Sequence, residues 1–455
     1  MNSNTLFTYR SGLYSCLTRS RDALMNLNDA LLSDTAAHSF VELSQSPFFG
    51  RDWSSIYAAC ENGAVDSAAL RQLRVHHAPL CMVTKRLILA GDASSIARPY
   101  SKTARDRTFV HQSNLPEGTK PVRPGWQFSF VVIPPEEISS WVYTLDVERI
   151  GSDKTACVVM SEQLSRIMTL LQTGGESGSR PLFLGDGGYG NVAFLTKTRL
   201  IPCDCLVRLA KNRVLYRPKP ERPDQPGRGR PPEDGARFSC QNQETQGVAD
   251  RFWSGEDAQG KQIEVHLRKW LRHFACWTNL HFKEEREMLV SVIKVIRHGA
   301  PDNKRDPKVC WFVFQGEECP TLCEVPSLYA RRYCIEHGFR FKKQNLLWEK
   351  VRLRTPERFA IWTDIVCCVE NQLCIARQEG LAKRQAWESD RRPATPQQVR
   401  RGMNPILVEL GTPARLCQTR GKSVGWVKGT GRRREKCYPV LQKTTKTTQK
   451  NVTIV

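Results

Sequence analysis

The sequence predicts an α/β protein in which a mixed sheet is flanked by helices and interrupted by a β-rich insertion, with an N-terminal helical domain and a basic C-terminal tail. Three observations favour this class. Two short apolar runs, 87–92 and 181–186, each end in an aspartate. Hydrophobic residues make up 40% and aromatic residues 9% of the 455 positions, which is too many for a disordered chain. The net charge of +22 lies outside the first 80 residues.

Apolar and charged patterns divide the chain into five segments. Residues 1–80 show short apolar repeats at three- and four-residue spacing, which is typical of helices. The predicted segments are the N-terminal helical domain, 1–80; the first part of the α/β core, 81–209; the insertion, 210–325; the helical completion of the core, 326–390; and the basic tail, 391–455.

The order of elements in 81–209 carries the fold prediction. An amphipathic helix at 161–171, ended by Gly174 and Gly175, lies between the third and fourth strands, and a short helix follows the fourth. The predicted strands are 87–92, 126–133, 141–150, 181–186 and 205–209. Three strands, a helix, a strand, a helix and a strand is the order that ribonuclease-H-like nucleases use.

Asp92 and Asp186 stand at the predicted strand ends, where open α/β sheets gather a ligand site. The alternative is that each aspartate caps the turn that follows it, but two matched cases in one sheet favour a site. Asp106 competes with Asp92 but follows a loop-like stretch. Asp146 ends no strand, because the apolar pattern continues to Ile150.

The insertion is expected to hold an exposed loop and several strands. Residues 216–235 are rich in Pro, Arg and Gly, and their arginines could contact a phosphate backbone. Strand-like runs follow at 262–267, 273–277 and 309–314, with a helix-like stretch at 284–296. Trp253, Trp270 and Trp277 in this region could stack on an unpaired base or pack inside the insertion.

After Pro326, which suits the first turn of a helix, four polar residues share one predicted helical stripe. Residues of this stripe lie within about 60° of one another at 100° per residue. The stripe consists of Tyr329, Arg332, Glu336 and Lys343. Ala330, Cys334, Phe341 and Trp348 form a separate face that could pack on the sheet.

The spacing Tyr-x2-Arg-x3-Glu-x6-Lys resembles the YREK signature of DDE transposases from bacterial insertion sequences. Asp186, followed by Tyr189 three residues on, is similar to the second motif of that family. The resemblance spans about residues 81–390. It implies a ribonuclease-H-like core that cuts DNA at the terminal inverted repeats of its element and joins the 3′-OH ends to target DNA.

The family chemistry matches the residues. In-line phosphoryl transfer uses two divalent ions, and carboxylates are ligands that Mg²⁺ accepts. The resemblance implies that Asp92, Asp186 and Glu336 hold Mg²⁺, with Mn²⁺ as a possible substitute. It also implies that Arg332 and Lys343 contact phosphates. From the residues alone, both cations could instead be ion-pair partners of Glu336.

Tyr329 would, by the same resemblance, pack against or hydrogen-bond the DNA backbone. Double-stranded DNA, as element end and as target, is the implied partner, and a homodimer or larger synaptic complex is the implied assembly.

The distribution of charge supports a polyanionic partner. Residues 1–80 hold six basic and seven acidic residues, whereas 401–455 hold twelve basic and two acidic ones, including Arg432 to Arg434. Clustered cations gain affinity for phosphates by displacing counterions. DNA ends would be read by the N-terminal helices in this family, but the basic tail is a competing anchor, and a purely solubilising tail is the alternative.

The cysteines and the apolar runs exclude other classes. The 17 cysteines are scattered, and Cys319-x3-Cys323 lacks the spacing of a zinc site, so reduced thiols are expected. No uncharged apolar run reaches eighteen residues, and the first residues do not resemble a signal peptide. We therefore expect a cytoplasmic protein with no membrane partner, and the resemblance to transposases of bacterial insertion sequences implies a bacterial, nucleoid-associated protein.

Two functions remain open at this level. The first is an active DNA transposase. The second is a decayed or repurposed transposase that binds DNA without cutting. The presence of all three carboxylates and the full stripe favours the first.

Overall fold

The computed structural model describes most of the chain. The described residues are 3–79, 86–112, 120–134, 140–173, 179–220, 232–258, 269–298, 307–383, 387–388, 394–418, 425, 427–429, 431 and 435–443. Four sequence predictions lie outside these residues: the turn at Gly174 and Gly175, most of the Pro/Arg/Gly run, the strand at 262–267 and the charges of Arg432 to Arg434.

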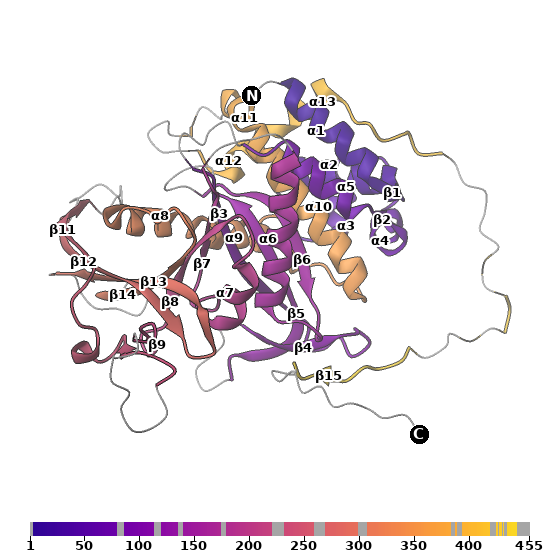
Figure 1. Cartoon of the computed structure of the whole chain (residues 1–455). Helices are drawn as coiled ribbons and strands as arrows, with labels where there is room; N and C mark the ends of the chain where they lie inside the picture. The colour runs from indigo at the N-terminus through magenta and orange to yellow at the C-terminus, as the bar shows by residue number, and fades with distance from the viewer. Residues whose placement is uncertain are drawn as a thin grey trace.

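A mixed sheet of five strands forms the core (Figure 1). Its strands are β3 (Ile88–Ala97), β5 (Val122–Ile133), β6 (Tyr143–Ile150), β7 (Leu182–Gly185) and β8 (Asp204–Leu209). They are ordered β6-β5-β3-β7-β8, with β3, β7 and β8 parallel and β5 antiparallel to β3 and β6. The predicted ribonuclease-H-like mixed sheet is confirmed. A strand that the sequence analysis missed, β4 (Arg107–His111), pairs with the start of β5.

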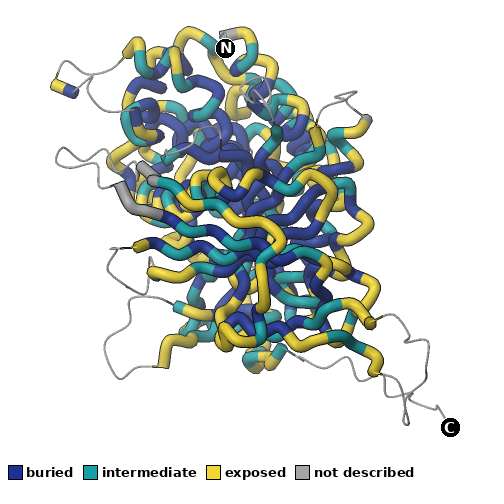
Figure 2. Tube along the Cα trace, turned by 60° about the vertical axis from the view of Figure 1, so that its left-hand side comes forward, coloured by how far each residue is buried: buried dark blue, intermediate teal, exposed yellow. Residues whose placement is uncertain are grey.

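Helices cover both faces of this sheet. Helix α6 (Ala156–Thr173) lies on one face together with α7 (Val192–Thr198). On the other face, Phe130 of β5 contacts Phe339 and Trp348, at centroid distances of 5.0 and 5.3 Å. Because side chains alternate across a strand, one strand supplies both apolar layers. Figure 2 shows the resulting buried interior, in dark blue.

The insertion extends the core sheet as a series of antiparallel strands. These are β9 (Val214–Tyr216), β10 (Arg237–Ser239), β11 (Arg251–Ala258), β12 (Lys269–Phe282), β13 (Glu285–Arg297) and β14 (Val309–Gln315). Strand β14 pairs with β8, so the insertion continues the core sheet without a break. The predicted helix at 284–296 is wrong. Buried and less buried positions largely alternate along 288–297, which is the pattern of a strand, and its β-branched Val and Ile residues favour strands.

The predicted single helix after Pro326 is also wrong. The chain forms α8 (Val325–Arg331) and α9 (Cys334–Gln344), with Arg332 and Tyr333 between them. Helix α10 (Pro356–Ile375) follows and is almost entirely buried, and α11 (Arg377–Ala382) comes next. The four residues of the predicted stripe therefore come from two helices and the turn between them.

The N-terminal residues are helical as predicted. They form α1 (Ser3–Cys16), α2 (Arg21–Ser33), α3 (Phe40–Leu43), α4 (Trp53–Asn62) and α5 (Ser67–His76), with a small ribbon of β1 (Leu17–Arg19) and β2 (Ala64–Val65). They do not form a separate body. Helices α1, α2 and α4 pack on α10, and α5 packs on β6.

A buried ion pair lies inside this contact. Arg10 donates to both carboxylate oxygens of Asp29, at 2.7 and 3.0 Å, and to Gln372 of α10 at 3.1 Å. Both charged side chains are only 2% exposed.

The predicted start of the tail at residue 391 is too early. Residues after 394 form α12 (Pro396–Arg401) and α13 (Met403–Leu410). Arg400 is 1% exposed and donates to the carbonyl of Leu31, which joins α12 to α2. Further on, β15 (Val440–Leu441) pairs in parallel with β4, so part of the basic segment returns to the sheet. Among the described helices, none is long and apolar enough to span a membrane.

We predict that Arg10→Ala destabilises the whole chain by about 3–5 kcal/mol, because it leaves Asp29 buried without a counter-charge. Urea unfolding followed by tryptophan fluorescence measures the loss. The exposed Arg19, changed to Ala, is the control and should leave the midpoint unchanged. A separate early transition confined to the N-terminal helices would contradict the shared core.

Candidate active site

Asp92 and Asp186 are placed side by side by the register of two parallel strands. Strand β3 pairs with β7 at Ala90 and Leu184, so the residues two positions later, Asp92 and Asp186, occupy matching places. Neighbouring strands lie about 4.8 Å apart, and residues two apart share a face. Asp186 follows the end of β7, as predicted, but Asp92 lies in the middle of β3 because pairing with β5 continues to Ala97.

The face that Asp92 presents follows from its neighbour. A Cβ on Gly91 would lie 2.4 Å from Phe183 and 2.7 Å from Met160 of α6, so Gly91 faces the α6 side with no room for a side chain. Alternation then turns Asp92 to the opposite face, where α8 and α9 lie. The 21% exposure of Asp92 leaves it accessible from that face.

The residues after Asp186 form a tight turn. The Asp186 carboxylate accepts a hydrogen bond from the backbone N–H of Gly188 at 2.9 Å, so the aspartate does shape the turn that follows it. Tyr189 is 3% exposed and packs its ring on Phe183 and Phe194. The aromatic residue of this motif therefore anchors the turn in the core and leaves the carboxylate at the surface of the sheet.

Two cations at opposite ends of α9 contact β3 and bracket Glu336. Arg332 donates to the carboxylate of Asp92 at 3.1 Å, and Lys343 donates to the carbonyl of Ser95 at 3.1 Å. Glu336 and Lys343 are seven residues apart and share a face of the helix. Glu336 is therefore directed toward the stretch of β3 that begins at Asp92, and it is exposed.

The charges of Asp186 and Glu336 both act on Asp92. Burial raises the pKa of Asp92 to about 6; Arg332 opposes this rise in pKa, while the charges of Asp186 and Glu336 add to it. Arg332 is a partly buried cation, and burial alone would lower its pKa. The charges of Asp92, Tyr329 and Asp186 raise the pKa of Arg332 instead. One guanidinium thus offsets only part of the negative charge at this place.

The site has the chemistry of a divalent-cation site without its closed geometry. Its donors are carboxylate oxygens, which hard cations prefer. In the part of the chain that the structure describes, no three His, Cys, Asp or Glu side chains are placed as a ready ligand set. Arg332 supplies the positive charge beside Asp92 where a cation would bind. Asp92, Asp186 and Glu336 have the chemistry to hold divalent cations, provided that the Arg332 guanidinium moves off Asp92.

Tyr329 and Arg332 are neighbours at the end of α8. The Arg332 guanidinium lies 5.9 Å from the centroid of the Tyr329 ring, which also packs edge-on against Phe312 of β14. Lys343 lies 5.9 Å from the Trp348 ring, and burial lowers its pKa. Arg332 pairs with Asp92, so the ion pair with Glu336 that the sequence left open forms with a different carboxylate.

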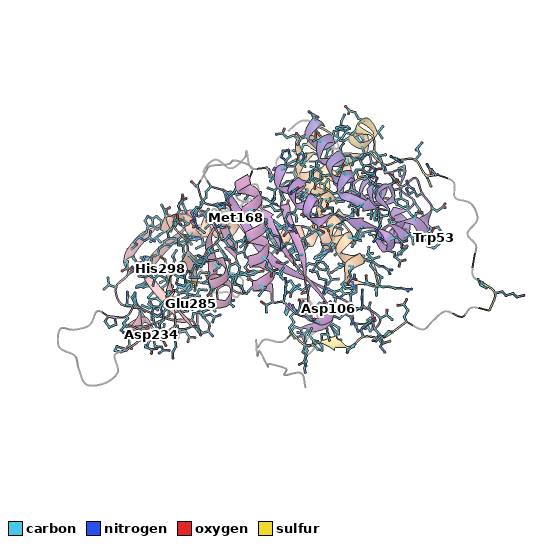
Figure 3. The ribbon with its side chains drawn as sticks, turned by 45° about the vertical axis from the view of Figure 1, so that its right-hand side comes forward. Trp53, Asp106, Met168, Asp234, Glu285 and His298 are labelled. Carbon is cyan, nitrogen blue, oxygen red and sulfur yellow. The ribbon has the colours of Figure 1, made fainter. Side chains whose placement is uncertain are left out.

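The competing aspartates have structural partners elsewhere. Asp106 pairs with Arg149 beside β4, at the end of the sheet marked in Figure 3. Asp146 is 2% exposed and pairs with Arg71 and Arg166. Both carboxylates are thus held away from the turn of Asp186.

The described tryptophan side chains of the insertion pack against other aromatic residues rather than standing free to stack on a base. Trp277 is 4% exposed and stacks on Trp311 with centroids 5.9 Å apart. Trp253 packs edge-on against Phe274. The side chain of Trp270 lies outside the described residues.

The sequence analysis missed Lys342, which is next to Lys343 but buried. The signal was present, because Ile335, Gly338 and Lys342 follow the i, i+3, i+7 spacing of a buried helix face. Its partner, Glu370, lies in the middle of α10 and has no sequence motif around it.

Comparison with known proteins gives a family match. Residues 12–270 match the family model described as DDE superfamily endonuclease. That span includes Asp92 and Asp186 and ends before Glu336. Among solved structures, one similar chain is a piggyBac transposase in a synaptic complex with hairpin DNA, with a TM-score of 0.42 and 10% identity, covering 86% of this chain and 71% of that one. No curated protein matches the sequence.

We predict that Asp92→Asn stabilises the protein at pH 8, in chelator and without divalent ions. The pKa of Asp92 rises from 3.8 to about 6 on folding, so its charged form disfavours the folded state above pH 6, and this penalty disappears as the pH falls toward 4. Asn, which mimics the neutral acid, should add up to about 3 kcal/mol at pH 8 and almost nothing at pH 4. Urea unfolding at both pH values measures the difference, and equal gains at both would contradict it.

Proposed function

Because the chain belongs to the DDE superfamily of endonucleases, we propose that it is a DNA transposase that cuts at the terminal inverted repeats of its own element and joins the 3′-OH ends to target DNA. The family match supports a nuclease of the transposase type. The reaction, the element ends and the residues named below are our proposal.

One observation carries this proposal. The parallel register places Asp92 next to Asp186, and Glu336 of α9 contributes to the same local field. This arrangement supports a shared carboxylate site built from two strands and a helix. Burial is the main cause of the raised pKa of Asp92, and the charges of Asp186 and Glu336 add to it.

Asp92, Asp186 and Glu336 are the proposed metal ligands, with Mg²⁺ as the ion and Mn²⁺ as a substitute. When bound, a pair of divalent ions supplies positive charge to the attacking and leaving oxygens of an in-line displacement at phosphorus. The rigid sheet fixes the two aspartates, and α9 brings in the glutamate. DDE superfamily endonucleases depend on divalent metal, which agrees with an all-oxygen ligand set.

We propose two roles for Arg332, one in the metal-free protein and one in the metal-bound complex. Without metal it neutralises Asp92 at 3.1 Å. If the carboxylates were neutralised by bound metal, the Arg332 guanidinium would be available to the DNA phosphate beside the cut, where its fork geometry suits bidentate contact. Lys343, on the same face of α9 as Glu336, is proposed to contact a second phosphate, and the Tyr329 ring to support the backbone between them.

DNA recognition outside the carboxylates has two proposed anchors. The N-terminal helices contain six basic residues, but Arg10, Arg71 and Arg74 are paired with Asp29, Asp146 and Asp364. The C-terminal segment, with twelve basic and two acidic residues after 400, therefore remains the stronger electrostatic anchor. Cutting two ends in one event requires at least two copies, so we propose a dimeric or larger complex on DNA.

We predict that Asp186→Asn, Asp92→Asn and Glu336→Gln each abolish Mg²⁺-dependent nicking of a duplex that carries the sequence flanking the gene. Each change removes a charged ligand and keeps the side-chain volume. Gel analysis of end-labelled duplex measures nicking, and size-exclusion chromatography checks folding.

Glu287→Gln, at an exposed position near the start of β13, is the matched control and should nick like the wild type. Wild-type protein that binds the duplex but never nicks it would favour a non-catalytic DNA-binding protein. Full activity of Glu336→Gln alone would remove Glu336 from the site and leave the two aspartates.

We predict that Arg332→Gln binds Mn²⁺ more tightly than the wild type in the absence of DNA, because the cation that competes for Asp92 is gone. The same change should slow nicking by about 10- to 100-fold, because a phosphate contact is lost. Calorimetry and nicking rates measure the two effects. Arg237→Gln, at an exposed position of β10, is the control, and weaker Mn²⁺ binding by Arg332→Gln would contradict the exchange.

A further inference from the structure

A fully buried ion pair lies directly behind the helix that carries Glu336. Lys342 of α9 and Glu370 of α10 are 1% and 2% exposed, and their Nζ and Oε2 atoms are 2.5 Å apart. The Lys342 ammonium also lies 5.4 Å from the centroid of the Phe130 ring. Phe130 is the residue of β5 that pairs with Asp92 of β3. The pair thus joins the glutamate helix to the sheet beside the aspartates.

Glu370 is itself fixed to the edge of the core sheet. Its Oε2 accepts a hydrogen bond from the Thr144 hydroxyl at 3.1 Å. The adjacent Asn371 accepts from the Thr144 N–H and donates to the Thr144 carbonyl, both at 2.8 Å. In the described sheet β6 pairs only with β5, so one side of its backbone is open to such contacts. Helix α10 is therefore docked at one defined residue of β6.

Gly338 makes room for the pair. A Cβ at this position would lie 2.5 Å from Val142, 3.4 Å from Glu370 Oε1 and 3.5 Å from Lys342 Nζ. A side chain there would push α9 away from the sheet edge. The glycine inside the helix therefore allows the close approach that lets Lys342 reach Glu370.

The contacts of α9 fix its rotation as well as its distance from the sheet. Lys342 projects about 120° around the helix axis from Glu336. On the side of Glu336, Arg332 and Lys343 contact Asp92 and Ser95 of β3. A slip of one residue would turn Glu336 by about 100°, away from Asp92 and Asp186. From behind, the buried pair resists that slip together with the packing of Phe339 on Phe130.

The pair is a poor source of stability. Burying two charges costs more than most apolar replacements of the same volume, which are often neutral or stabilising. Glu370 Oε1 has no hydrogen-bond partner within the described residues, and burial raises the pKa of Glu370. The Lys342–Glu370 pair therefore contributes a specific geometry to the contact between α9 and α10 rather than a gain in stability.

We infer that Lys342 and Glu370 are positioning residues that set the register of α9, so that Glu336 meets Asp92 and Asp186. This inference rests on the proposed function, because it assigns the pair a role in the same metal-dependent cleavage. Neither residue touches DNA or a reacting atom.

The test is the double variant Lys342→Met/Glu370→Leu in the full-length chain, which replaces the pair by apolar groups of similar size. We expect thermal stability close to that of the wild type, with kcat for nicking reduced by about 10- to 100-fold, KM for the duplex unchanged and weaker Mn²⁺ binding by calorimetry. If the role of the pair were purely structural, the double variant would have the kcat of the wild type as well as its stability. A double variant that nicks and binds Mn²⁺ like the wild type overturns the inference.

Glu370→Asp serves as the second variant if the double variant does not fold. It keeps both charges but shortens the acid by one methylene, so Lys342 must shift. Intermediate Mn²⁺ affinity and kcat support positioning, and full values for both contradict it. Lys350→Met, the same change at an exposed lysine, is the matched control.

The metal readout separates the two proposals. If the wild type binds Mn²⁺ in a Glu336-dependent way but never nicks DNA, the proposed function fails while the register of α9 is still tested by Mn²⁺ affinity. If the wild type nicks DNA and the variants behave like it, only the positioning role fails.

Discussion

The parallel pairing of β3 with β7 is the constraint on which the rest of the site depends. It matches Ala90 with Leu184 and so places Asp92 beside Asp186 without any contact between their side chains. The backbone ladder holds the two charges together, and the Gly91 backbone, pressed against Phe183 and Met160, turns Asp92 to the open face. Burial raises the pKa of Asp92 to about 6 and the charge of Asp186 adds to this rise, so the folded site favours a nearby cation, which Arg332 supplies only in part.

The third carboxylate depends on a different kind of constraint. Glu336 is on a helix that no strand pairing fixes, so side chains must set its distance and rotation. Arg332 and Lys343 contact β3 from the front, and Lys342 reaches Glu370 from behind. Helix α10 is central to this arrangement because it also packs against the N-terminal helices and β6. The first and last helices of the chain thereby support a site to which they contribute no ligand.

The sequence predicted the parts of this structure that local pattern determines. Apolar strands ending near Asp92 and Asp186, and the spacing from Tyr329 to Lys343, identified the sheet and the candidate residues. Long-range pairing was not predictable. The charged start of 284–296 suggested a helix, but the β-branched residues there complete a strand between β12 and β14. The break at Arg332, the burial of Lys342 and the folding of 396–410 against α2 and α11 depend on partners far away in the chain.

The most direct test of the account is the anomalous diffraction of Mn²⁺ in crystals of the full-length protein bound to a duplex element end. The account predicts Mn²⁺ within about 2.5 Å of carboxylate oxygens from Asp92, Asp186 and Glu336, with Arg332 moved from Asp92 toward a phosphate. Mn²⁺ bound away from these three residues, or an Arg332 that stays on Asp92 in the metal-loaded complex, would contradict it.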